Sequence, residues 1–247
     1  MVKVLELFSG TGSVSKLCEK IGFDKVSVDL ILPADYNVDI MDFDYKQYDK
    51  DEFDIIWASP PCTNYSKLQD CWLGRMRKGE LYTKEIQDKE MENDDKLVLK
   101  TLEIIDYFKP DLWFIENPYS SKMKDRPFMK DLPFYVVDYC MYSDWGYKKR
   151  TRIWTNKKDF NAKLCDGSGS CGNMVDNNHK LLLGNGYEII DGKKTLCNSK
   201  IKRDNLRKLH KNNLVNTERK QKTNGKSLSQ LERYRIPEDL IFSLFLE

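Results

Sequence analysis

A strand, a glycine turn and a helix are predicted in succession within the first 22 residues, and this order constrains the fold more than any other feature. Residues 2–8 alternate and favour a strand, whereas apolar residues from Val14 to Ile21 recur at helical spacing before Gly22. Between them lies Gly10-Thr11-Gly12. Glycines there let a ligand approach the backbone, and a helix N-terminus favours an anionic group. The alternative interpretation is a tight strand–helix corner without a ligand.

The same alternation continues along the chain. Further strands are predicted at residues 25–30, 53–58, 112–115, 134–141 and 152–155, and a helix at 93–108. Residues 63–89 form a long polar connection, and residues 227–246 become helical again, divided by Pro237 into two short helices. Strands that alternate with helices predict an α/β fold, doubly wound, with a mostly parallel sheet covered on both faces.

The composition divides the 247 residues into three parts. Residues 1–160 are expected to form the main domain, 161–226 a small irregular appendage, and 227–247 a helical segment that packs back on the main domain. Residues 200–226 hold ten lysines and arginines against two acids. Such a basic stretch is typical of nucleic-acid contact, and a solvated linker is the alternative.

The cysteines and the hydropathy pattern bear on the compartment. Seven cysteines, mostly without paired spacing, favour free thiols in a reducing environment. No apolar stretch approaches the roughly 20 residues that span a bilayer, and no cleavable leader is recognisable. We therefore expect a protein that is not secreted and that lies in the cytoplasm. If the source is eukaryotic or viral, we expect it in the nucleus or in a viral factory. A monomer is the default expectation.

Cys62 is the strongest candidate for catalysis. It follows Pro60 and Pro61 at the end of the apolar run 53–58, where open α/β sheets carry their sites. An enzyme that methylates an exocyclic nitrogen would carry Asp-Pro-Pro-Tyr at this place. Carbon 5 of cytosine is a poor nucleophile until a thiolate adds to carbon 6, so a cysteine here points to that chemistry. The alternative is an inert buried cysteine.

Three further side chains are candidates for the same site. Glu116 ends the apolar run 112–115, and a partly buried carboxyl group can remain protonated near neutral pH and share a proton with a ring nitrogen. Arg150 and Arg152 alternate, so both point to one side of a strand and can contact a base and its phosphate. The alternatives are a structural carboxylate and an exposed strand face.

Two other groups of residues do not decide which ligand, if any, the protein binds. Asp29 ends the second predicted strand, where an acid accepts hydrogen bonds from ribose hydroxyls, but an NAD site would use the same residue. Cys165, Cys171, His179 and Cys197 offer metal-binding side chains. Because these residues contain no Cys-x-x-Cys pair and are irregularly spaced, we expect no metal.

Together these motifs resemble those of the cytosine-5 DNA methyltransferases that use S-adenosylmethionine. Residues 7–12 are similar to the first motif of the family, Pro61-Cys62 with Ser66 to the nucleophile motif, and Glu116-Asn117 to its Glu-Asn-Val motif. Arg150-Thr151-Arg152 is similar to a Gln-x-Arg-x-Arg motif, and residues 231–239 to a late motif. The resemblance assigns the cofactor site to Phe8, Ser9, Gly10, Thr11, Gly12, Ser13, Asp29, Leu30, Asp39, Ile40 and Pro61.

The resemblance implies a Rossmann-like domain that methylates carbon 5 of a cytosine flipped out of double-stranded DNA. Cys62 would be the nucleophile, Glu116 the group at ring nitrogen 3, and Arg150 and Arg152 the contacts to base and phosphate. The appendage 161–226 would recognise the target sequence. Two alternatives keep the motif set: methylation of cytosine in transfer RNA, and a catalytically impaired DNA-binding relic of the family.

Overall fold

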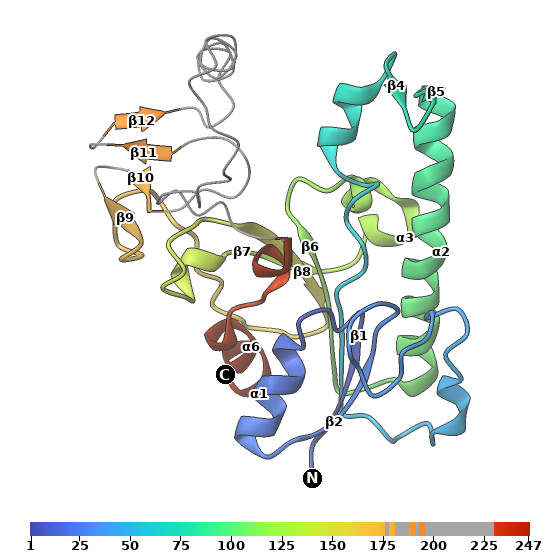
Figure 1. Ribbon diagram of the computed structural model, residues 1–247. Helices are drawn as coiled ribbons and strands as arrows, with labels where there is room; N and C mark the ends of the chain where they lie inside the picture. The colour runs from blue at the N-terminus through green and yellow to red at the C-terminus, as the bar shows by residue number, and fades with distance from the viewer. Residues whose placement is uncertain (176–177, 181–187, 191–192, 196–229) are drawn as a thin grey trace, which may run out of the picture.

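The computed structural model describes residues 1–175, 178–180, 188–190, 193–195 and 230–247. Its centre is a six-stranded sheet in the order β2-β1-β3-β6-β8-β7 (Figure 1). Strands β2 (Asp24–Val28), β1 (Lys3–Leu7), β3 (Ile55–Ala58) and β6 (Leu112–Pro118) run parallel. Strand β8 (Arg150–Thr155) is antiparallel to β6 and to β7 (Phe134–Asp138). The predicted mostly parallel sheet is thereby confirmed.

Helices cover both faces of the sheet, as predicted. Helix α2 (Lys84–Phe108) packs on one face, and helices α1 (Ser13–Ile21) and α6 (Glu238–Leu246) pack on the other. The rings of Phe114 in β6 and Phe245 in α6 lie 5.7 Å apart. Because the middle strands are buried on both faces, their sequences read as continuous apolar runs. Pro237 separates α5 (Gln230–Tyr234) from α6, as predicted.

Helix α2 begins nine residues before its predicted start, so the expectation of a connection throughout residues 63–89 was wrong. The Thr83 side chain caps the helix by accepting a hydrogen bond from the Ile86 backbone N–H. The first turns of α2 lack an apolar stripe because they pack through polar contacts. Glu90 accepts hydrogen bonds from Arg77 and Tyr82, at 2.7 and 2.8 Å. The connection also contains a 3₁₀ helix, η2 (Lys67–Trp72), and a hairpin of β4 (Met76–Arg77) and β5 (Glu80–Leu81).

Two strand boundaries near the candidate site differ from the prediction. Strand β6 continues to Pro118, so Glu116 and Asn117 lie within the strand, because β8 pairs with it as far as Pro118. Strand β7 ends at Asp138, and the chain then forms the 3₁₀ helix η4 (Tyr139–Met141) instead of continuing as a strand.

The remaining elements are short. They are η1 (Tyr45–Gln47), η3 (Lys122–Asp125), α3 (Pro127–Lys130), β9 (Met174–Val175), β10 (Asn178–His179), β11 (Glu188–Ile190) and β12 (Lys193–Thr195). Strand β9 pairs antiparallel with β10, and β11 pairs antiparallel with β12. The basic stretch 200–226 and Cys197 lie outside the described residues. Among the helices that the structure describes, none has the length and apolar character needed to cross a bilayer.

Candidate active site

Cys62 lies in a loop that is anchored to the neighbouring strand. Residues 60–62 follow β3 directly, and β3 pairs with β6. The Asn117 side chain in β6 is 1% exposed and donates a hydrogen bond from Nδ2 to the Pro60 carbonyl, at 2.9 Å. A side chain of β6 thus fixes the backbone two residues before the thiol, while Cys62 itself stays partly accessible.

Glu116, the residue before Asn117, points to the opposite face of the sheet and is buried in a polar cluster. Its Oε1 accepts a hydrogen bond from the Tyr139 hydroxyl at 2.9 Å and lies 3.3 Å from the Lys149 ammonium nitrogen. Lys149 also lies over the Tyr139 ring and donates to the Arg233 carbonyl, at 3.2 Å. The side chains of Glu116 and Lys149 are only 8% and 9% exposed, so water screens this ion pair weakly.

These charges act on Cys62. Burial raises the pKa of the Cys62 thiol above its usual value, and the negative charge of Glu116 raises it further. The positive charge of Lys149 opposes both effects, and Asp94 adds a smaller upward contribution. Glu116, Lys149 and Cys62 are therefore coupled electrostatically. A change that reduces the negative charge of Glu116 would favour the thiolate form of Cys62.

The two arginines expected at this site do not face Glu116. Arg152 is paired with Asn117 across the β6–β8 ladder, and Glu116 is paired with Ile153, so Arg152 and Glu116 lie on opposite faces. Arg150, on the Arg152 face, forms a two-pronged ion pair with Asp138, with N···O distances of 2.8 and 3.0 Å. Arg152 lies over the Phe134 ring at 4.1 Å, and its buried Nε has no hydrogen-bond partner. Their predicted alternation on one face is correct, but Lys149 is the basic residue that reaches Glu116.

The glycine turn between β1 and α1 is tightly wound. Phe8, Gly10 and Gly12 all have positive φ, at 55°, 55° and 65°. Ser9 is buried, and its hydroxyl has no hydrogen-bond partner. A side chain at Gly12 would meet no atom within 4 Å, so space is open beside the turn.

The buried Glu6 side chain accepts hydrogen bonds from the first backbone N–H groups of α1. Its carboxylate, 2% exposed, accepts hydrogen bonds from the backbone N–H groups of Val14 and Ser15 and from the Ser15 hydroxyl. Burial raises the pKa of Glu6 to about 6, and these hydrogen bonds limit the rise. Since a carboxylate already takes these backbone donors, the start of α1 is a poor site for the pyrophosphate of a dinucleotide. This observation counts against the NAD alternative.

The acids expected to contact a ribose are engaged within their own loops. The Asp29 carboxylate accepts hydrogen bonds from the backbone N–H groups of Gly10, Ile31 and Leu32, at 2.7–2.8 Å. It therefore ties the glycine turn to the end of β2 and retains little free acceptor capacity. Asp39 accepts from the Met41 N–H. Leu30 is 61% exposed and Ile40 is a core residue, whereas Pro61 is exposed beside Cys62.

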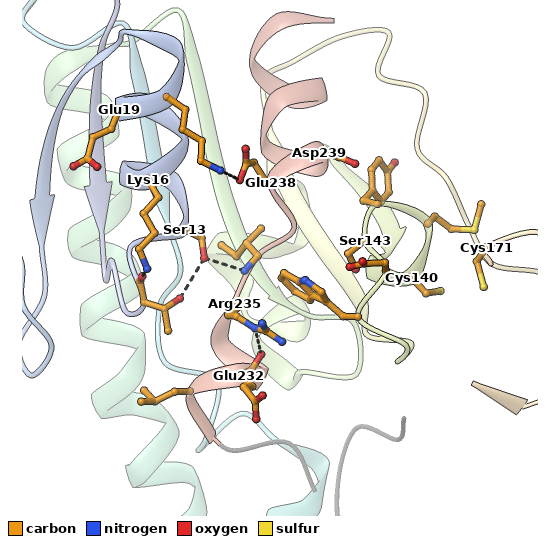
Figure 2. Close-up of a pocket in the computed structure, with 18 residues that line it drawn as sticks. Ser13, Lys16, Glu19, Cys140, Ser143, Cys171, Glu232, Arg235, Glu238 and Asp239 are labelled. Atoms are coloured by element: carbon orange, nitrogen blue, oxygen red, sulfur yellow. Dashed lines mark hydrogen bonds and ion pairs between the residues drawn. The ribbon is translucent and has the colours of Figure 1, made fainter. Parts of the chain in front are cut away.

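A cavity of about 1070 Å³ opens beside the glycine turn, between α1, η4 and the C-terminal helices (Figure 2). Thr11 and Ser13 line it, and Ser13 accepts a hydrogen bond from the Ile236 backbone N–H at 3.1 Å. Arg235 lines the same cavity and lies over the Trp145 ring at 4.2 Å. Cys62 and Glu116 are not among its lining residues, so the cavity adjoins the glycine turn rather than the thiol.

Comparisons with known proteins show the family to which this chain belongs. A probable DNA (cytosine-5)-methyltransferase of Frog virus 3 (isolate Goorha) is 44% identical over 178 residues, which are 71% of this chain and 80% of the viral protein. The chain belongs to the DNA (cytosine-5)-methyltransferase family. No family model matches it.

Two solved structures of methyltransferases show lower similarity. A putative DNA modification methyltransferase encoded within an E. coli prophage matches with a TM-score of 0.45 and 14% identity, over 76% of this chain and 58% of that one. The Dnmt2 methyltransferase of S. pombe matches with a TM-score of 0.41 and 15% identity, over 66% of this chain and 52% of that one. This chain thus spans between half and three fifths of those proteins.

Two residues that contact Glu116 in the structure were not predicted from the sequence. Lys149 and Tyr139 contact Glu116 but carried no motif signal of their own. The only sequence cue for Lys149 is that it alternates with Arg150 and Arg152, and therefore occupies the other face of β8.

Proposed function

We propose that this protein transfers a methyl group from S-adenosylmethionine to carbon 5 of cytosine in DNA, with Cys62 as the nucleophile. The observation that carries the proposal is the anchoring of the Cys62 loop by Asn117, beside the buried Glu116–Lys149 pair. The DNA substrate is supported by the 44% identity to a protein named as a probable DNA (cytosine-5)-methyltransferase.

The residues at the glycine turn fit S-adenosylmethionine. The unpartnered Ser9 hydroxyl and the space beside Gly12 can accommodate a ligand, and Glu6 places negative charge next to it. When bound, this cofactor supplies an electrophilic methyl group on a positively charged sulfur. The residues proposed to form this site are Phe8, Ser9, Gly10, Thr11, Gly12, Ser13, Asp29, Leu30, Asp39, Ile40 and Pro61. Among them, Asp29 and the buried Ile40 would shape the site rather than offer free hydrogen-bonding groups to the cofactor.

The first chemical step is addition to the ring. A target cytosine is flipped out of the base stack into the site, since carbon 6 is inaccessible within a duplex. The Cys62 sulfur forms a bond to carbon 6, and the electron pair of the carbon 5–carbon 6 double bond moves toward carbon 5 and the ring. Glu116 donates a hydrogen bond from its protonated carboxyl group, or the proton itself, to ring nitrogen 3, which draws electron density toward that nitrogen and favours addition of the Cys62 sulfur to carbon 6. Lys149 and Tyr139 position the Glu116 carboxyl group.

The second step restores the aromatic ring. Carbon 5, now nucleophilic, forms the bond to the methyl group, and then loses its proton to a base or water. The electron pair of that carbon–hydrogen bond re-forms the double bond and expels the Cys62 sulfur as thiolate, while ring nitrogen 3 returns to Glu116 any proton that it received. The products are 5-methylcytosine, S-adenosylhomocysteine and one proton, so the enzyme returns to its initial state.

The segment after Ser66 is proposed to contact the DNA. The η2 helix and the β4–β5 hairpin carry apolar side chains that are exposed in the free protein. They are Leu68, Trp72, Leu73, Met76 and Leu81. Apolar side chains of this kind serve as wedges between base steps, and a segment that closes over the substrate also excludes water.

The test is transfer of a labelled methyl group from S-adenosylmethionine to unmethylated duplex DNA and, in parallel, to unmodified transfer RNA. We expect label in DNA from the wild type, none from Cys62→Ala, and label again from the matched variant Cys71→Ala, which loses an exposed thiol but keeps Cys62. Label in RNA alone would keep the chemistry and overturn the proposed substrate. Label in neither would favour the impaired relic.

A further inference from the structure

Four metal-binding side chains converge outside the candidate active site. Cys140 lies in η4, Cys165 and Cys171 lie in the segment between β8 and β9, and His179 lies in β10. Their ligand atoms all lie within 4.8 Å of one another. Cys140 and Cys165 are buried, whereas Cys171 and His179 are partly buried.

The spacing of these atoms matches a tetrahedral metal site. The His179 Nε2 lies 3.7 Å from the Cys165 sulfur and 3.6 Å from the Cys171 sulfur. With usual zinc–sulfur and zinc–nitrogen bond lengths, a tetrahedral ion separates a sulfur and a nitrogen ligand by about 3.6 Å and two sulfurs by about 3.8 Å. The nitrogen is thus already at ligand distance from two sulfurs, and the cluster as a whole needs only a small contraction.

The backbone around the cluster is built to hold the ligands in place. The loop between Cys165 and Cys171 reverses direction through Gly167 and Gly169, both with positive φ, and the Asp166 carboxylate accepts a hydrogen bond from the Ser168 N–H at 2.8 Å. Positive φ is costly for residues other than glycine, so this loop shape is specified by the sequence.

A buried asparagine connects the parts that carry the ligands. Asn173 is 1% exposed, and its Nδ2 lies 2.8 Å from the Cys140 carbonyl, 2.7 Å from the Ser143 carbonyl and 3.0 Å from the Cys171 carbonyl. Its Oδ1 accepts a hydrogen bond from the Gly146 N–H. The two cysteine-bearing backbones are therefore held together by a polar group that is independent of the cysteine side chains.

We propose that Cys140, Cys165, Cys171 and His179 bind one structural zinc ion. Three thiolates and one imidazole form a complete tetrahedral set, which leaves no position for substrate and is typical of structural rather than catalytic zinc. The soft sulfur ligands and the tetrahedral arrangement favour zinc over magnesium, calcium or manganese. Binding requires that the three thiols release their protons, so affinity for the ion falls at low pH.

The expectation of no metal rested on the irregular spacing of Cys165, Cys171, His179 and Cys197, a set that does not include Cys140. Cys140 precedes Cys165 by 25 residues and belongs to η4, which the fold brings to the start of the appendage. Cys197, which the sequence grouped with the others, lies outside the described residues.

The zinc ion would link the appendage, which begins at residue 161, to the six-stranded sheet. The Cys165 backbone N–H donates to Asp138, at the end of β7, and the Lys148 ammonium donates to the Cys165 carbonyl, each within 3 Å. Cys140 and Cys171 also line the cavity beside the glycine turn (Figure 2). Zinc at this point would hold the base of the predicted target-recognition region at a fixed place beside the sheet.

The test begins with the full-length wild-type protein, purified under reducing conditions. After incubation with zinc and removal of unbound ions, we expect about one zinc per chain by elemental analysis. Exchange for cobalt should give the visible absorption bands of tetrahedral thiolate coordination. Absence of bound zinc and of these bands would overturn the proposal, whatever the methyltransferase activity.

Variants assign the ligands. Cys171→Ser and His179→Ala should lose most of the bound metal and lower the melting temperature, whereas Cys71→Ser should bind as much zinc as the wild type. In the wild type, alkylation of Cys140, Cys165 and Cys171 should become fast only after a chelator is added. Fast alkylation of these cysteines before the chelator is added would contradict the proposal, as would unchanged zinc content in both ligand variants.

Discussion

The Lys149 ammonium lies 3.3 Å from the Glu116 carboxylate, and both side chains are more than nine-tenths buried. Lys149 immediately precedes β8, and its side chain points to the Glu116 face of the sheet, while Arg150 and Arg152 point to the other face. A buried carboxylate without a partner is costly, and the Lys149 ammonium supplies that partner to Glu116. Lys149 is therefore proposed as a positioning residue for Glu116 and as a control on the Cys62 thiol.

This relationship predicts the reactivity of Cys62 in the free protein. Glu116→Gln removes a negative charge that raises the pKa of the Cys62 thiol, so its alkylation by iodoacetamide at neutral pH should become faster. Lys149→Met removes a positive charge that lowers the pKa, so alkylation should become slower. Each change should be on the order of three- to tenfold. Peptide mass spectrometry measures the rates, with the exposed Cys71 as an internal reference. Slower alkylation of Cys62 in Glu116→Gln and faster alkylation in Lys149→Met would refute this electrostatic coupling.

Asn117 should matter for turnover more than for cofactor binding. In Asn117→Asp a carboxylate oxygen replaces the amide that donates to the Pro60 carbonyl, and two acceptors then face each other in a buried place. We expect a loss of about 1–3 kcal/mol in the free energy of unfolding and at least a tenfold lower kcat, because the Cys62 loop loses its anchor.

The matched control for this prediction is Asn156→Asp. Asn156 is exposed, and its side-chain amide donates to the Asp111 carbonyl near the opposite end of β6. In this variant kcat should stay within about twofold of the wild-type value, because the same amide-to-carboxylate change is made far from the Cys62 thiol. Equal losses of kcat in the two variants would show that Asn117 acts only through general stability.

Glu6 should make stability depend on pH. The pKa of Glu6 is about 6 in the folded protein against an ordinary value of 4.5, so the folded protein holds this proton more tightly than the unfolded chain. The contribution of Glu6 to stability is therefore present below pH 4.5 and decreases as the pH rises toward 6. The decrease amounts to about 2 kcal/mol in the free energy of unfolding.

Denaturant unfolding between pH 4 and 7 measures this effect. Glu6→Gln has no proton to lose, so its stability should fall less than that of the wild type over this interval, by about the same 2 kcal/mol. Parallel pH dependences for the two proteins would mean that Glu6 is not the titrating group.

The sequence predicted the parts of the site that lie at the ends of parallel strands. Cys62 and Glu116 each follow a continuous apolar run, and the carboxyl ends of parallel strands meet at one edge of a sheet. Such positions can be inferred without knowing how the strands pair. The glycine turn was predictable for a similar reason, because only a few residue types tolerate its positive φ values.

The contribution of Lys149 could not be predicted in this way. Whether Lys149 or Arg150 faces Glu116 depends on the antiparallel register of β8 with β6, and a shift by one residue would exchange the two faces. Asp29 shows the converse limit, because its position at the end of β2 was clear but its hydrogen bonds to three backbone N–H groups were not. The Cys140 sulfur comes within 4.8 Å of the side-chain ligand atoms of Cys165, Cys171 and His179 only through the tertiary fold.

A covalent bond between the Cys62 sulfur and carbon 6 of the target cytosine can be trapped with a modified DNA substrate. Duplex DNA with 5-fluorocytosine at the target position cannot release a proton from carbon 5 after methyl transfer, so the adduct should persist. With S-adenosylmethionine we expect a denaturation-resistant complex whose DNA is attached to the Cys62 peptide, and none with Cys62→Ser. A complex attached to another residue, or normal methylation of unmodified DNA by Cys62→Ser, would contradict the account.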